Sequence, residues 1–130
     1  MSDPTAKSAL FDAFAQVGKA LSSGRRVEIL DVLANGERNV EGLAGELGLS
    51  IANASRHLQI LRHAGLVTAR RERTLIHYRL AAPEVFAFLS SFRSLAMSRL
   101  DEVERLAEAY LGHRDDLEPV TRAELARRLR

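Results

Sequence analysis

Apolar positions recur every three or four residues in four segments of the first half of the chain. This spacing places them along one face of a helix. Ser, Asn and Gly residues stand between the segments, where they cap or break helices. The pattern therefore predicts a mainly α-helical fold that begins with four helices, over residues 5–22, between Ser23 and Asn35, over 40–47 behind Asn39, and over about 51–64.

A short turn, Gly48-Leu49-Ser50, separates the third and fourth predicted helices. Gly48 suits the left-handed position at a helix end, and Gly65 suits the same position after the fourth helix. The hydroxyl of Ser50 can accept a hydrogen bond from an amide of the next turn as an N-cap. Two short helices joined by a Gly-containing turn form a helix-turn-helix, which is a DNA-reading motif.

On a helical wheel the fourth helix divides into two faces. Its predicted core face holds Ile51, Ala54, Leu58 and Leu61. The other face carries short hydrogen-bonding side chains and one arginine near the helix N-terminus, and these residue types read base edges in the major groove. The predicted base-reading residues are Ser50, Asn53, Ser55, Arg56 and Gln59.

The period changes to that of β-structure between residues 67 and 81. Two β-forming runs flank Arg71–Thr74, which is the expected turn of a two-stranded hairpin. A hairpin directly after a recognition helix is a wing. Its arginines suit phosphates or the minor groove, although arginines of an exposed hairpin can also be merely solvated. The predicted wing contacts are Arg70, Arg71 and Arg73.

A long helix is expected from Pro83, because proline followed by Glu84 is typical of a first helical turn. Its 3-4 spacing continues to Tyr110, further than a small winged-helix core can cover. We expect this seam to pack against the same helix of a second subunit, with the first helix alongside; folding back on its own domain is the alternative. The predicted dimer-interface residues are Leu10, Phe14, Val17, Val85, Leu89, Phe92, Ala96 and Val103.

A linker and a last short helix are predicted at the end of the chain. Gly112 is expected to end the long helix, and the motif Thr121-x-x-Glu124 is a capping box for a last short helix. A chain of 130 residues fits one core. The expected organisation is a winged-helix DNA-binding and dimerisation domain over residues 1–113, followed by a linker and short terminal helix over 114–130.

Positive charge is concentrated in the middle of the chain, although the whole carries only +2. Residues 50–80 hold six Lys/Arg and one Asp/Glu, whereas residues 1–49 hold five and seven and residues 81–130 hold eight and nine. A basic stripe confined to one segment is typical of a protein with a polyanion partner. The charge favours double-stranded DNA as the partner over the alternative of a protein-interaction module.

The sequence offers little for other chemistry. It has no cysteine, which excludes disulfides, thiolate metal sites and redox thiols. His57 and His63 lie six apart on one helix, so their side chains diverge and cannot share an ion. Nothing reads as a signal peptide, a membrane span or a catalytic constellation. We expect a cytoplasmic protein that is not an enzyme and has no cofactor, no metal site and no membrane partner.

Several local motifs and the order of the elements are shared with one family. The matching motifs are Leu43-Ala44, Gly48-Leu49-Ser50, Ser55-Arg56-His57-Leu58, Leu61–Val67 and His77-Tyr78-Arg79-Leu80. Over about residues 10–110 the chain resembles the ArsR-type winged-helix repressors of bacteria. The resemblance implies a homodimer that binds a palindromic operator, blocks transcription and is released by an inducer.

The chain departs from that family at its sensing sites. Members that sense metals or thiol chemistry have cysteines on the third helix, where this chain has Asn39 and Glu41. A second family site uses Asp and His at the ends of the long helix, and the matching positions here are Ala82, Glu84, Leu95 and Ser98. The inducer is therefore unknown: a small organic ligand near the dimer seam, a partner domain, or no inducer at all.

Two further features bear on the comparison. Arg73 stands where the family often has a wing-turn glycine, so a longer or differently shaped tip is expected. Residues 117–125 resemble the junction in a subgroup fused to a rhodanese-like domain, but the given sequence ends at Arg130, so sulfurtransferase activity is not carried over. The interpretation is a sequence-specific transcriptional regulator, a homodimeric repressor; the alternative is a winged-helix interaction module that does not read DNA sequence.

Overall fold

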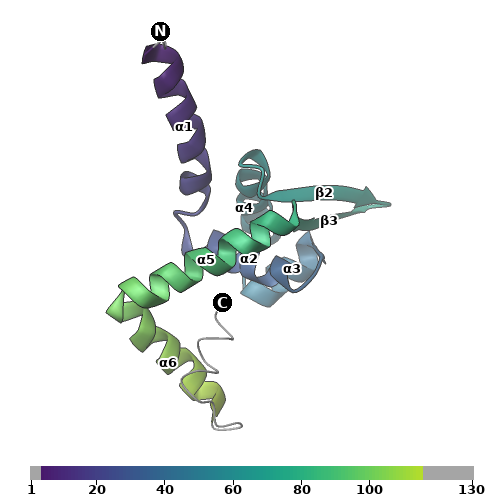
Figure 1. Ribbon diagram of the computed structural model, residues 1–130. Helices are drawn as coiled ribbons and strands as arrows, with labels where there is room; N and C mark the ends of the chain where they lie inside the picture. The colour runs from purple at the N-terminus through teal and green to yellow at the C-terminus, as the bar shows by residue number, and fades with distance from the viewer. Residues whose placement is uncertain (1–3, 116–130) are drawn as a thin grey trace. The chain divides into compact units, whose positions relative to one another are not determined.

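The computed structural model describes residues 4–115, with side chains up to residue 112. It divides the chain into two compact units, Met1–Val85 and Phe86–Arg130. The predicted linker and last helix lie outside the described residues. Figure 1 shows the elements in chain order: α1 (Pro4–Ala20), α2 (Gly24–Ala34), β1 (Arg38–Asn39), α3 (Val40–Leu47), α4 (Ile51–His63), β2 (Val67–Glu72), β3 (Leu75–Leu80), α5 (Pro83–Arg99) and α6 (Asp101–Asp115).

The first unit is a winged helix-turn-helix, as the sequence predicted. Its four helices lie where the apolar spacing placed them, within one or two residues at each end. The strands form an antiparallel sheet in the order β1-β3-β2. The two-residue strand β1 was not predicted, because two residues are too few to show a period.

The predicted caps of the helix-turn-helix are confirmed. The Asn39 side chain accepts from the amide of Gly42 at the start of α3, and the Ser50 hydroxyl accepts from the amide of Asn53 at the start of α4. Gly48 ends α3 with φ of 65°, in the left-handed region that glycine adopts without strain. These caps fix the residue at which the recognition helix begins.

The core of the first unit is formed mainly by aliphatic side chains. The largest fully buried side chains are Tyr78, Ile29, Leu30, Leu43, Leu58, Leu61 and Val67. The prediction that Ile51 belongs to the core face was wrong, because its side chain is 54% exposed. Ile51 is the first residue of α4, one turn before Ala54 reaches the core. A helical wheel shows toward which side of the helix a side chain points, but it does not show how far along the helix the core extends.

The wing turn is shorter than expected. Glu72 pairs with Leu75, so Arg73 and Thr74 alone connect β2 to β3. Arg73 has φ of 60°, the left-handed conformation that a two-residue hairpin turn requires. The expectation of a longer tip was wrong, because the arginine adopts the conformation that a glycine would. The assignment of Arg71 and Glu72 to the turn was also wrong, since both lie in β2.

The expected single long helix is two helices. α5 ends at Arg99 and α6 begins at Asp101, and Figure 1 shows the chain changing direction between them. The charges on either side of the break suit two separate helix dipoles: Arg99 stands in a last turn, and Asp101 and Glu102 stand in a first turn. α6 also continues through Gly112 to Asp115, so the predicted end at Gly112 was wrong.

The predicted interface residues differ in exposure. Leu10 and Phe14 of α1 are exposed, whereas Val85 and Leu89 of α5 are buried within one chain. The remaining four, Val17, Phe92, Ala96 and Val103, are half-buried. None of the helices between residues 4 and 115 combines the length and the apolar character that spanning a bilayer requires.

Candidate nucleic-acid interface

The first turn of α4 protrudes from the first unit. The four consecutive residues Ser50–Asn53 are all exposed, and Arg56 is exposed one turn further along. The Ser50 hydroxyl accepts the cap bond from Asn53 and keeps its own proton free to donate. Within the described part of the chain, the guanidinium of Arg56 makes no hydrogen bond or ion pair. Of the predicted base-reading residues, Ser50, Asn53 and Arg56 therefore lie exposed together at this end of the helix. Ser55 lies there too but is half-buried, and Gln59 is exposed further along the helix.

Gln59 connects the recognition helix to the wing. Its Nε2 donates to the hydroxyl of Tyr78 at 3.3 Å, and Tyr78 is almost fully buried in β3. A buried hydroxyl needs a hydrogen-bond partner, and this bond supplies it. The side-chain amide of Gln59 thus joins α4 to β3. Its role in reading bases stays a prediction.

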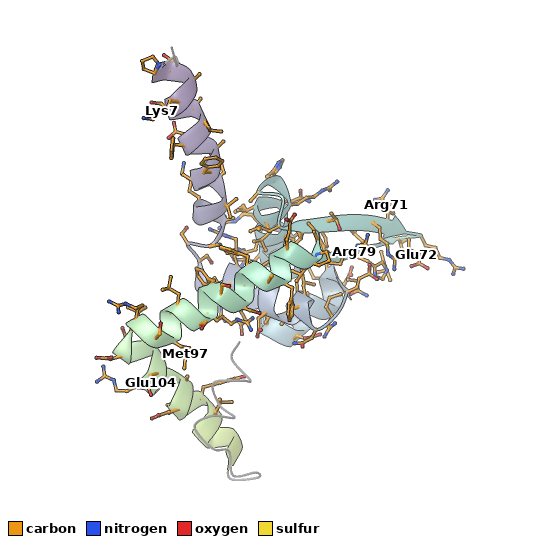
Figure 2. The ribbon with its side chains drawn as sticks, viewed as in Figure 1. Lys7, Arg71, Glu72, Arg79, Met97 and Glu104 are labelled. Atoms are coloured by element: carbon orange, nitrogen blue, oxygen red, sulfur yellow. The ribbon has the colours of Figure 1, made fainter. Side chains whose placement is uncertain are left out.

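The register of the wing separates its arginines into two faces. Cross-strand partners share a face, so Arg71 and Ile76 lie on the face of Tyr78, which is the side of α4. Arg70 pairs with His77 and Arg79 with Thr68 on the opposite face. Figure 2 shows Arg71 and Glu72 near the far end of the hairpin and Arg79 closer to the helices.

Arg70 is held by two carboxylates. Its Nε and Nη2 donate to both oxygens of Glu37 at 2.9 and 2.8 Å, and its Nη1 donates to Glu72 at 2.8 Å. Hydrogen bonding to Arg70 lowers the pKa of Glu37 and of Glu72. Glu72 also lies 3.8 Å from the Nε2 of His77. This cluster ties the wing to the loop before β1 and largely neutralises Arg70.

Arg71 and Arg73 differ from Arg70. Both are exposed, and neither makes a hydrogen bond or an ion pair with any residue that the structure describes. Sequence reasoning treated the three arginines alike, because Glu37 lies 33 positions before Arg70 and its approach depends on the fold. It also missed Arg79, whose exposure follows from the alternation with buried Tyr78 and whose charge helps to lower the pKa of Glu37.

Arg26 connects three helices behind the recognition surface. Its guanidinium donates to the carbonyls of Ala20 at 2.7 Å and Lys19 at 3.1 Å, at the end of α1, and Nη1 lies 3.4 Å from Nδ1 of His57 on α4. Because a guanidinium can only donate, Nδ1 accepts and the neutral ring carries its proton on Nε2. Burial, together with Arg26 and then Arg56, lowers the pKa of His57. His57 thus has a hydrogen-bond partner behind the recognition surface.

The described residues contain no group of three or more His, Cys, Asp or Glu side chains that could hold a metal ion. Among the positions compared with the family's sensing sites, the two that carry carboxylates, Glu41 and Glu84, are both exposed. The geometry that remains is a protruding helix end beside exposed wing arginines. Such a surface binds a polyanion through phosphates and reads base edges with a helix N-terminus.

Comparison with known proteins assigns the family. Residues 23–69 match the model described as bacterial regulatory protein, arsR family. The HTH-type transcriptional regulator Rv0081 of Mycobacterium tuberculosis is 35% identical over 105 residues, which are 79% of this chain and 92% of that protein. This chain belongs to the ArsR family. The crystal structure of Rv0081 matches at a TM-score of 0.67 with 32% identity, covering 78% of this chain and 97% of that one.

Two further relatives are more similar in sequence. The solution structure of a homodimeric winged helix-turn-helix DNA-binding domain, fragment 1–100 of Mb0332 from Mycobacterium bovis, matches at a TM-score of 0.72 with 45% identity. The match covers 78% of this chain and 93% of that fragment. The HTH-type transcriptional regulator Rv0324 of M. tuberculosis is 46% identical over 122 residues, 94% of this chain, and the match spans about half (53%) of that protein. These relatives are named as transcriptional regulators.

Proposed function

We propose that this protein is a sequence-specific DNA-binding transcriptional regulator that acts as a homodimeric repressor on a palindromic operator. The observation that carries the proposal is the exposed run Ser50–Asn53 at the start of α4, together with Arg71 and Arg73 of the wing, which have no partner among the described residues. In a helix-turn-helix, the N-terminal residues of the second helix contact base edges in the major groove. In this proposal Ser50, Asn53 and Arg56 take that role. Ser55 is half-buried, and Gln59 is exposed but also donates to Tyr78.

The wing arginines contribute unequally to the DNA contact in this proposal. Arg71, on the side of α4, and Arg73, at the tip, contact phosphates or the minor groove. Arg70 contributes less to the DNA contact, because Glu37 and Glu72 already occupy its guanidinium. The phosphate contacts fix the position of the protein, and α4 supplies the sequence preference.

A second copy of the chain would cover the apolar surface of α1. Leu10, Phe11 and Phe14 are all more than half exposed, and the rings of Phe11 and Phe14 meet edge to face at 5.6 Å. Exposed apolar side chains that gather in one place mark an interaction site. The related Mb0332 fragment is described as homodimeric. A twofold dimer binds two half-sites separated by one helical turn of DNA or a multiple of it.

The remaining assignments follow from this role. A regulator of transcription works where the DNA is, so we assign the protein to the cytoplasm of a bacterial cell. Catalysis forms no part of the proposal. We leave the inducer unspecified, with a small organic ligand near the dimer seam as the first class to test.

The proposal is tested by fluorescence anisotropy with a duplex selected from genomic fragments and a shuffled duplex of the same length and composition. The expected result is tight binding of the selected duplex, weak binding of the shuffled one, and log K that falls linearly with log salt for both. Equal affinity for both duplexes, or binding that does not depend on salt, would instead support an interaction module that does not read sequence.

A further inference from the structure

The protruding end of the recognition helix has an apolar part. Ile51 and Ala52 stand between Ser50 and Asn53, and the Ile51 side chain is 54% exposed. The neighbouring apolar residues of the same helix, Ala54 and Leu58, are fully buried. Ile51 is therefore an apolar side chain left in water at the point of the molecule that the proposed function inserts into the major groove.

The major groove presents one apolar feature to such a side chain. Each base edge shows hydrogen-bond donors or acceptors, and thymine alone among the four standard bases adds a C5-methyl group. Contact between two apolar groups removes both from water and stabilises the complex by an amount proportional to the area covered. An isoleucine cannot hydrogen-bond to the other base edges.

We propose that Ile51 contacts the C5-methyl group of a thymine in each operator half-site and thereby selects thymine at that position. Ala52, small and exposed beside it, allows the helix end to approach the base edge closely. The inference rests on the proposed function and adds a specificity-determining residue to it. It assigns an apolar contact to α4 next to the hydrogen-bonding contacts of Asn53 and Arg56.

The first test replaces thymines by deoxyuridine in the selected operator, one symmetric pair of positions at a time. Deoxyuridine lacks only the methyl group and pairs in the same way. The wild-type protein is expected to lose about fourfold in affinity per half-site at one position, the effect of one buried methyl group, and little elsewhere. Selection is also expected to return thymine at that position in both half-sites.

The second test measures the same thymine and deoxyuridine operators with variants of Ile51. Ile51→Ala is expected to bring the affinity ratio of the two operators close to one, whereas Ile51→Val keeps methyl groups and most of the ratio. A change in DNA stiffness caused by deoxyuridine would affect all three proteins equally. A difference between the proteins in the ratio of thymine to deoxyuridine affinity therefore reports the side-chain contact alone. Thermal unfolding by circular dichroism confirms that each variant is folded.

The outcomes separate the two proposals. If the wild type prefers the operator to a shuffled duplex but binds the thymine and deoxyuridine forms equally, the assignment of Ile51 is overturned and DNA reading stands. A ratio that persists in Ile51→Ala also overturns it, because another residue then contacts the methyl group. If the wild type has no operator preference, the proposed function itself fails.

Discussion

At the scale of the residue, the wing shows how neighbours in sequence acquire different roles. Arg70 and Arg71 have the same side chain and adjacent positions in one strand, yet they lie on opposite faces of the hairpin. Arg70 meets Glu37 and Glu72, whereas Arg71 stays unpaired among the described residues. Of these two arginines, Arg71 alone can release counterions from DNA without first breaking an ion pair.

We therefore expect Arg71→Ala to weaken binding to every duplex and to reduce the slope of log K against log salt by about 0.9, the loss of one phosphate contact. Arg70→Ala is the matched control, because it removes the same charge from the neighbouring position. It is expected to change the slope much less. Anisotropy titrations at several salt concentrations measure both, and equal slopes for the two variants would show that the pairing of Arg70 does not matter.

Local residue chemistry could be predicted, and distant partners could not. Ser50, Asn39 and Gly48 were identified as caps because a cap depends on the few residues that follow or precede it. The pairing of Glu37 with Arg70 joins residues 33 apart, so it depends on how β1 meets the wing. The exposure of Ile51 depends on how far along α4 the core extends. The periodicity of a single helix does not show this.

At the scale of the element, the recognition helix is attached to its neighbours near its middle. Gln59 binds Tyr78 of β3, and His57 binds Arg26, which also caps the end of α1. The break between α5 and α6 was not predicted. The 3-4 spacing continues past it to Tyr110, whereas Arg99 stands at a helix end and Asp101 at a helix start. These charges agree with the break, which the apolar periodicity does not show.

The contact between Arg26 and His57 predicts a pH dependence. The folded protein lowers the pKa of His57 below its ordinary value of 6.5, through burial and the nearby charges of Arg26, Arg56 and Arg25. The unfolded chain therefore binds more protons between the two pKa values. The contribution of neutral His57 to stability is present above about pH 6.5 and is lost as the pH falls toward the folded pKa.

Urea unfolding between about pH 5 and pH 7.5 measures this effect. The wild type is expected to lose more stability on acidification than His57→Gln, which keeps a hydrogen-bonding side chain but does not titrate. Glu37 and Glu72 have lowered pKa values and titrate below this range, so they do not obscure the comparison. Parallel pH profiles for the two proteins would show that folding does not lower the pKa of His57.

At the scale of the whole molecule, the distribution of charge agrees with separate segments for DNA binding and for dimerisation. The segment of residues 50–80, with net charge +5, contains α4 and the wing, while the flanking segments that contain α1, α5 and α6 are slightly acidic. A basic reading surface and less basic helices with exposed apolar side chains suit a protein that binds DNA with one part and a second copy with the other.

Dimerisation is tested at Phe92, a half-buried residue of α5 whose ring lies 6.0 Å from that of Phe88. Phe92→Glu places a charge in the proposed seam and is expected to abolish the dimer and most of the operator affinity together. Ser91→Glu is the control, since it adds the same charge at an exposed neighbouring position. Sedimentation at micromolar concentration gives the oligomeric state, and a monomeric wild type would refute the proposed assembly.

The central claim is that α4 reads DNA sequence, and Arg56 tests it most directly. We predict that Arg56→Ala lowers the preference for the operator over a shuffled duplex by about 1–3 kcal/mol, the value of a bidentate contact to guanine. Arg62→Ala, which removes the same charge from an exposed position six residues further along α4, should leave that preference nearly unchanged. If Arg56→Ala retains the full operator preference in anisotropy measurements, α4 does not read the sequence in the way proposed.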